Sequence, residues 1–229
     1  MRLITDGVAM LELSIDLGEY KMEIHPTLVW DDKDVILVDT GFPGMLPALQ
    51  AEMESAGAPM ERLTKVILTH QDFDHMGGLP DILAAVDRPV EVYAHAADKP
   101  YIEGHIPLLK HDPSQGQPPT AHVDTVIDDG DVLPTNGGLQ VIFTPGHTPG
   151  HMSLYHLPSH TLITGDATVS ESGELRGPNL AYTPDVEKAW QSFGRFADFD
   201  VQQAVCYHGG LCAGKVNEQI RALSAQASV

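Results

Sequence analysis

Segment 69–75 brings together four side chains of the kinds that commonly bind metal ions, namely His70, Asp72, Asp74 and His75. The segment follows the apolar run 66–68 and precedes two glycines and a run with helical spacing, which predicts a strand, a tight loop and a helix. The first His–Asp pair is spaced by two residues at the strand end, where alternate side chains share a side, whereas the second pair is adjacent and diverges. One loop could therefore contribute ligands to two neighbouring metal positions.

Three later apolar runs each lead into another residue that can bind a metal ion. Residues 139–144 lead into His147, residues 161–164 into Asp166, and residues 204–207 into His208. Functional side chains gather beyond strand ends in sheets that helices cover, because the rigid strands position the loops. A solvated polar loop would account for segment 69–75 alone, but not for this recurrence.

The order and spacing of these residues resemble the signature of the metallo-β-lactamase superfamily, which is H-x-H-x-D-H followed by a histidine, an aspartate and a final histidine. The resemblance extends from the strand and turn at 35–41 to the last histidine of the set. It implies an α/β fold, a four-layer αβ/βα sandwich with a binuclear metal site along one edge. It also implies a first ion held by His70 and His147, a second ion held by Asp74, His75 and His208, and Asp166 as the bridge between them.

Two further positions resemble residues that support such a site. Asp39 ends the apolar run 35–38 and is expected to orient the metal ligands from behind. His151 lies four residues after His147, at a position where the family often has another histidine. We expect His151 to support a ligand rather than to bind metal itself.

Asp72 stands where the superfamily usually has its second histidine. A third carboxylate makes the centre less positive, so two divalent ions there should be weaker Lewis acids and a bound water less acidic. Zinc is the expected metal, while the harder oxygen ligand also favours manganese or iron at the first position. Flavodiiron proteins of the same superfamily have a glutamate there, so a diiron oxidoreductase is one alternative. A catalytically quiet metal-binding sensor or scaffold is another.

The composition favours one globular domain over residues 1–229. The chain is 42% hydrophobic and 20% charged, which provides enough apolar side chains for a substantial core. Neither a signal peptide nor a membrane-spanning run is recognisable, which predicts a cytoplasmic protein without a membrane partner. The net charge of −19 is spread along the chain and repels polyanions, so we expect a small-molecule substrate and no nucleic acid. The sequence allows a homodimer.

Apolar periodicity predicts the elements that position these residues. Strands are expected at 8–15, 27–30, 35–38, 63–68 and 89–93, and then at 139–144, 152–156, 161–164 and 204–207. Helices are expected at 46–56, 79–86, 185–196 and 213–225. Cys206 is predicted to be a buried strand residue and Cys212 a loop thiol, and we expect neither to bind metal.

Segment 99–122 has no regular period, and its five prolines exclude a long helix. A long irregular segment inside a compact domain is typical of a lid, so we expect a cover or insertion over the metal edge. The remaining histidines are expected to face solvent or the lid rather than to bind metal. They are His105, His111 and His122 in this segment, and His25, His95, His156 and His160 elsewhere.

The resemblance implies a metallo-hydrolase. A hydroxide bridging two ions would attack a carbonyl or phosphoryl centre, and Asp74 would orient it and shuttle its proton. Few basic side chains are available to bind phosphate, which favours a lactone or another small carboxylic ester. Lactone hydrolases that resemble this chain commonly have a tyrosine three residues after the bridging aspartate, where this chain has Val169. Tyr182 is the candidate to contact substrate in its place.

Overall fold

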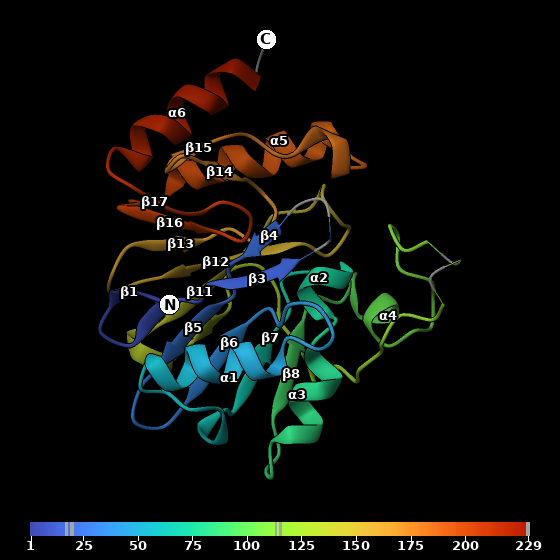
Figure 1. Ribbon diagram of the computed structural model, residues 1–229. Coiled ribbons are helices and arrows are strands. Elements are labelled where there is room, and N and C mark those ends of the chain that lie inside the picture. The colour runs from blue at the N-terminus through green and yellow to red at the C-terminus, as the bar shows by residue number, and fades with distance from the viewer. Residues whose placement is uncertain (17, 19–20, 113, 115, 228–229) are drawn as a thin grey trace.

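Two β-sheets pack face to face in the centre of the molecule, and helices cover their outer faces (Figure 1). The computed structural model describes residues 1–16, 18, 21–112, 114 and 116–227. Helices α1 (Leu46–Ser55) and α3 (Leu79–Ala85) lie on one side of the pair of sheets, and α5 (Val186–Gly194) and α6 (Val216–Ala227) on the other. None of the described helices combines the length and the apolar composition needed to cross a bilayer.

The first sheet has seven strands in the order β1-β2-β5-β6-β7-β8-β9. Their bounds are β1 Arg2–Thr5, β2 Val8–Met10, β5 Thr27–Trp30, β6 Val35–Val38, β7 Lys65–Ile67, β8 Glu91–Ala94 and β9 Thr125–Val126. Neighbouring strands are antiparallel from β1 to β6 and parallel from β6 to β9. Parallel neighbours need crossover connections, so the carboxyl ends of β6, β7 and β8 lie at one edge of the sheet.

The second sheet has six strands in the order β10-β11-β12-β13-β16-β17. Their bounds are β10 Val132–Leu133, β11 Leu139–Phe143, β12 Met152–His156, β13 Thr161–Ile163, β16 Gln203–Cys206 and β17 Gly210–Ala213. Only the pair of β13 and β16 is parallel among the described strands of this sheet. The strands expected at 152–156 and 161–164 are confirmed as β12 and β13, which pair with each other.

Three separate clusters of buried side chains fill the spaces between four layers. The first lies between the first sheet and its helices, the second between the two sheets, and the third between the second sheet and α5 and α6. Strand β6 shows why the clusters on the two faces of the first sheet are separate. Val35 and Leu37 belong to the first cluster, whereas the alternate residues Ile36 and Val38 belong to the second. A strand covered on both faces is apolar at every position. The predicted four-layer sandwich is therefore confirmed.

Helices α1 and α5 follow the local signals that predicted them. In α1, Leu49 and Met53 are one turn apart and both are buried. The side chain of Asp185 accepts a hydrogen bond from the Lys188 backbone N–H at 3.1 Å, which caps the start of α5. Phe193 of α5 then lies in the third cluster.

Smaller elements complete the chain. Two short hairpins pair β3 (Leu13–Asp16) with β4 (Lys21–Ile24) and β14 (Ser170–Glu171) with β15 (Glu174–Leu175). The helix α2 (Phe73–Met76) and the helix α4 (Lys99–Ile102) are each a single turn. Short 3₁₀ turns cover Met60–Arg62, Thr135–Gly137, Leu180–Tyr182 and Arg195–Asp198.

The prediction for the C-terminal half was wrong at β17, a strand that the sequence analysis did not expect. This strand pairs with β16, so the last helix begins at Val216 rather than at residue 213, and Cys212 is a buried strand residue rather than a loop thiol. Gly209 and Gly210 both have positive φ values, of 94° and 78°, and form the tight turn that reverses the chain. In the N-terminal half, the single strand predicted at 8–15 is two strands, β2 and β3, that belong to different sheets.

Two histidines expected to face solvent are buried. His25 is 7% exposed and its Nδ1 lies 3.2 Å from the Leu11 carbonyl oxygen. His156 is 1% exposed, in the middle of a sheet, and its Nε2 lies 2.9 Å from the Asn136 carbonyl oxygen. Each ring therefore has a hydrogen-bonding partner from a distant segment, which a local pattern does not reveal.

Segment 99–122 begins with α4 and has no further α-helix and no strand over its described part, and it lies at the same side of the molecule as α2 (Figure 1). Ile102 and Leu108 are buried in the first cluster, whereas Ile106 and Leu109 are exposed. Buried side chains thus hold the first half of the segment against the body of the protein. The backbone N–H of Leu109 also donates to the side-chain oxygen of Gln71 at 2.9 Å, which links the segment to the loop 69–75.

Candidate metal centre

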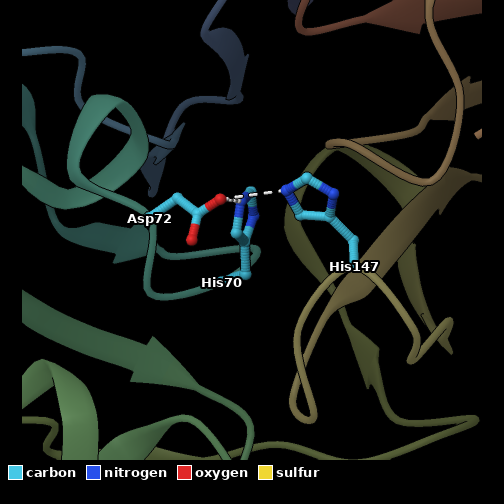
Figure 2. A group of neighbouring side chains, drawn as sticks. All are labelled: His70, Asp72 and His147. Carbon is cyan, nitrogen blue, oxygen red and sulfur yellow. Dashed lines mark hydrogen bonds and ion pairs between the residues drawn. The ribbon is translucent and has the colours of Figure 1, made fainter. Parts of the chain in front are cut away.

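The first group of candidate ligands joins two loops that are far apart in the sequence. His70 and Asp72 follow β7, and His147 follows β11, and the three side chains point toward one another (Figure 2). Asp72 Oδ2 lies 2.9 Å from His147 Nε2 and 3.3 Å from His70 Nε2. The loop after β7 therefore places both side chains beside the same point, and strand alternation is not the cause, because β7 ends at Ile67, three residues before His70.

The second group consists of Asp74, His75 and His208. Its first two members belong to α2, and His208 follows β16 of the other sheet. Asp74 Oδ2 lies 3.2 Å from His208 Nε2 and 3.6 Å from His75 Nε2. Asp72 and Asp74 are two residues apart and belong to different groups, because the helix begins between them, whereas the adjacent Asp74 and His75 belong to the same group.

Asp166 lies between the two groups. Its Oδ1 is 3.2 Å from His75 Nε2, and its Oδ2 is 3.3 Å from His147 Nε2 and 3.4 Å from His208 Nε2. The preceding residue, Gly165, has a positive φ of 51°, and a Cβ atom there would lie 2.7 Å from His151 Nε2. A glycine before Asp166 therefore allows the chain to turn sharply next to the buried imidazoles.

Unpartnered polar atoms mark this cluster as a fit for metal ions. Four of the five buried side-chain nitrogen and oxygen atoms without a hydrogen-bond partner in the described chain belong to it, namely His70 Nε2, Asp72 Oδ1, His75 Nε2 and Asp166 Oδ1. Leaving such atoms unpaired away from water is costly. Imidazole nitrogens and carboxylate oxygens that converge in this way are the ligands of divalent transition-metal ions.

Opposite charges shift the pKa values of the candidate ligands. Burial acts to raise the pKa of Asp72, but the neighbouring imidazoles and the Lys110 ammonium outweigh it and hold this pKa well below its usual value. Burial acts to lower the pKa of His75 and of His208, but Asp166 and the other carboxylates raise the first well above its usual value and the second to about 10. The His208 ring is therefore protonated at neutral pH in the metal-free protein, and a bound ion would displace that proton.

Asp39 and His151 lie behind the ligands, where the sequence placed them. Asp39 is buried with a positive φ of 62°, and its Oδ2 lies 2.8 Å from His75 Nδ1. The same carboxylate accepts hydrogen bonds from the backbone N–H and the hydroxyl of Thr69, both at 2.8 Å. This arrangement directs the other nitrogen of His75, Nε2, into the site.

His151 uses both of its ring nitrogens in hydrogen bonds. Its Nε2 accepts from the Asp166 backbone N–H at 2.9 Å, and its Nδ1 lies 2.9 Å from the Thr144 hydroxyl. Burial and the nearby imidazoles of His70 and His147 hold the pKa of His151 well below its usual value, so the ring is neutral. His151 thus fixes the backbone of Asp166 and is no member of the candidate ligand groups among the described residues.

Asp98 is a supporting residue that the sequence analysis missed. Its fully buried carboxylate accepts hydrogen bonds from the Gln71 backbone N–H at 3.0 Å and the Gln71 side-chain amide at 3.2 Å. It also accepts from the Thr148 hydroxyl at 2.6 Å and the Gly150 backbone N–H at 2.8 Å. The carboxylate therefore joins the loop that carries His70 to the loop that carries His147. Asp98 follows β8 at the edge of the sheet where candidate ligands follow other strands. This position in the sequence could have identified it as a residue of the site.

A pocket of about 420 Å³ opens over the two groups. Acidic and imidazole side chains from both groups form its floor, and its described walls are Met22, Phe42, Val169, Asn179 and Tyr182. Tyr182 is 65% exposed at its rim. A neighbouring pocket of about 240 Å³ shares Asp72 with it and is lined by Lys110.

Comparisons with known proteins agree with this geometry. The sequence profile of the metallo-β-lactamase superfamily matches residues 23–208. A protein named "Probable metallo-hydrolase YflN" from Bacillus subtilis (strain 168) is 31% identical over 206 residues, which cover 79% of this chain and 77% of that protein. "Probable metallo-hydrolase YybB" from the same organism is 28% identical over 190 residues, which cover 82% and 81% of the two chains.

The solved structure of the metallo-β-lactamase family protein TTHA1429 from Thermus thermophilus shares the fold. Its TM-score is 0.75 at 23% sequence identity, over 99% of this chain and 81% of that chain. With the profile match over most of its length, this chain belongs to the metallo-β-lactamase superfamily.

Proposed function

We propose that this chain is a metal-dependent hydrolase that holds two divalent ions and acts on a small ester. His70, Asp72 and His147 would hold the first ion, and Asp74, His75 and His208 the second. Asp166, within 3.4 Å of imidazoles from both groups, would contact both ions. The observation that carries this proposal is the position of the two groups, joined by one carboxylate, on the floor of a single pocket.

Bound divalent ions would supply an acidified water as nucleophile and would polarise the oxygen of the scissile bond. Asp74 can orient that nucleophile and accept its proton, because its side chain lines the pocket and its carboxylate lies among the imidazoles of the second group. Asp39 and His151 would keep the reacting geometry fixed through the hydrogen bonds described above.

The walls of the pocket support a small ester or lactone as substrate. The described wall residues are mostly apolar, and Lys110, the cation beside the floor, already contacts the Asp72 carboxylate, which suits an uncharged acyl group better than a phosphate. Val169 and Tyr182 both line the pocket, which supports Tyr182 as the residue that would contact the substrate. The net charge of −19 further disfavours polyanionic substrates.

Zinc is the proposed metal, because imidazole provides four of the seven candidate ligands. The carboxylate of Asp72 in the first group favours a second candidate function, that of a diiron oxidoreductase. Its oxygen is a harder ligand than imidazole and favours manganese or iron at the first position, as in a diiron oxidoreductase. A metal-binding sensor or scaffold without turnover is the third outcome that the same experiment distinguishes.

The test combines metal analysis with a substrate panel. Protein purified without added metal, and protein stripped with a chelator and reloaded with zinc, manganese or iron, would be assayed on ester, lactone, thioester and phosphodiester substrates. We expect about two ions per chain and turnover of the ester or lactone. Asp166→Ala should lower metal content and activity together, whereas Asp87→Ala removes the same charge from an exposed position and should change neither. Full metal content and activity in Asp166→Ala would refute the assignment, and iron with oxygen turnover would favour the oxidoreductase.

A further inference from the structure

Lys110 of segment 99–122 reaches into the first group of candidate ligands. Its Nζ donates to Asp72 Oδ2 at 2.5 Å and to His147 Nε2 at 2.7 Å. These two acceptor atoms are themselves only 2.9 Å apart, so one cation contacts both. The ammonium group therefore uses the same lone pairs that the proposed function assigns to the first metal ion.

The backbone around Lys110 is built to hold the side chain there. Leu108, two residues earlier, is buried in the first cluster. The backbone N–H of Leu109 donates to the side-chain oxygen of Gln71 at 2.9 Å, and Asp98 in turn holds Gln71. The Lys110 side chain is only 23% exposed, unlike a lysine that extends freely into water. The backbone next to Lys110 is thus held in place by buried contacts, and the side chain extends from it to the ligand group.

The second group has no comparable cation. Within the described part of the chain, no lysine or arginine forms an ion pair or a side-chain hydrogen bond with Asp74, His75 or His208. The two groups therefore differ in whether a cationic side chain already contacts the candidate ligands. An ion entering the first group must displace a tethered ammonium group, whereas an ion entering the second group meets no such cation among the described residues.

We infer that Lys110 is an intramolecular competitor for the first metal ion. The inference rests on the proposed two-ion centre. Asp72 Oδ2 and His147 Nε2 cannot bind the ammonium group and a divalent ion at the same time, so loading of the first group requires Lys110 to move out. The second group fills first as metal concentration rises, and the first group fills only at higher concentration.

Calorimetric titration of chelator-stripped protein with zinc tests this order directly. In Lys110→Met, which keeps the length of the side chain and removes its charge, the weaker of the two binding steps should become about tenfold tighter, equivalent to about 1.4 kcal/mol. Lys215→Met is the matched control, because Lys215 is 77% exposed and pairs with Glu218, so the same loss of charge there should leave both steps unchanged. Cobalt loading, followed by visible absorption, gives a second readout that does not depend on turnover.

A third variant shows whether the effect arises at Asp72. In an Asp72→Ala background the contact to Asp72 is lost and only the contact to His147 remains, so adding Lys110→Met should change the weaker step less than it does in the parent. Equal titration curves for the parent and Lys110→Met would overturn the competition, and so would an equal gain in Lys215→Met. Because the measurement is of binding, a protein that shows the competition but hydrolyses no substrate would contradict only the proposed reaction.

Discussion

Replacing Asp98 by alanine would remove a fully buried carboxylate that joins the two loops of the first ligand group. Four donors would lose their acceptor in a fully buried place, two from Gln71, one from Thr148 and one from Gly150. The hydroxyl and the side-chain amide can rotate toward other partners, but the two backbone N–H groups cannot. An unsatisfied buried donor costs about 1–3 kcal/mol, so the expected loss in the free energy of unfolding is about 2–6 kcal/mol.

This loss is a large part of the stability of an ordinary domain, which is about 5–15 kcal/mol. Urea unfolding of the metal-free protein, analysed by linear extrapolation, measures it. Asp98→Asn is the closer comparison, because it keeps the shape and one acceptor oxygen while its NH₂ group faces two of the donors. We expect roughly half the loss of the alanine variant, about 1–3 kcal/mol.

The same variants should weaken the first metal site more than the second. Gln71 lies between His70 and Asp72, and Thr148 follows His147, so the bonds of Asp98 align the ligands of the first group. The second ion should stay bound in Asp98→Asn while the first is lost at limiting metal. A neutral surface substitution changes the free energy of unfolding by at most about 0.5 kcal/mol. If the free energy of unfolding of Asp98→Asn differed from that of the parent by no more than this, and the variant kept both ions, Asp98 would not hold the loops together.

Three further outcomes are expected. Asp72→His removes one negative charge from the first group and should shift its preference from manganese toward zinc, measured by elemental analysis after competition between the two metals. An unchanged metal ratio would contradict a ligand role for Asp72. Because the pKa of His208 is raised to about 10 in the metal-free protein, zinc binding at pH 7.5 should release protons and strengthen as the pH rises toward that value. Titration calorimetry in buffers of different ionisation enthalpy counts those protons, and no release would refute the raised pKa. Finally, burial acts to raise the pKa of Asp34, but its bond to Lys65 outweighs burial and lowers this pKa below 3.8. The stability from this pair is therefore present above the unfolded value and is lost as the pH falls through the lower folded value. Lys65→Met should accordingly cost about 1 kcal/mol at pH 7 and progressively less below about pH 4, and a cost independent of pH would exclude the ion pair as its cause.

Most of the candidate centre could be predicted from the sequence, because each ligand follows its own apolar run. Strand ends deliver His70, His147, Asp166 and His208, and a strand end is a local property that alternation and flanking glycines reveal. The four layers followed from the family resemblance and agree with the continuous apolar strands. The ligand roles of these residues remain proposals that metal analysis will test.

Other features depended on tertiary structure alone. Strand β17 exists because β16 offers it an edge to pair with, and a pair of glycines in the sequence does not distinguish that hairpin from a loop. His156 is buried because the Asn136 carbonyl, twenty residues away, provides a partner for its ring. Long-range partners of this kind are set by the packing of sheets and not by any local period.

The sequence by itself determined which residue types arrive at the edge of the sheets and in what order. Only the tertiary structure decided how they are held and what competes for them. Asp98 bonds to residues 27 and 52 positions away, and Lys110, which follows α4 on segment 99–122, contacts Asp72 across 38 positions. Local propensity extends over a few residues, whereas such contacts depend on where separate loops come to rest in the folded chain.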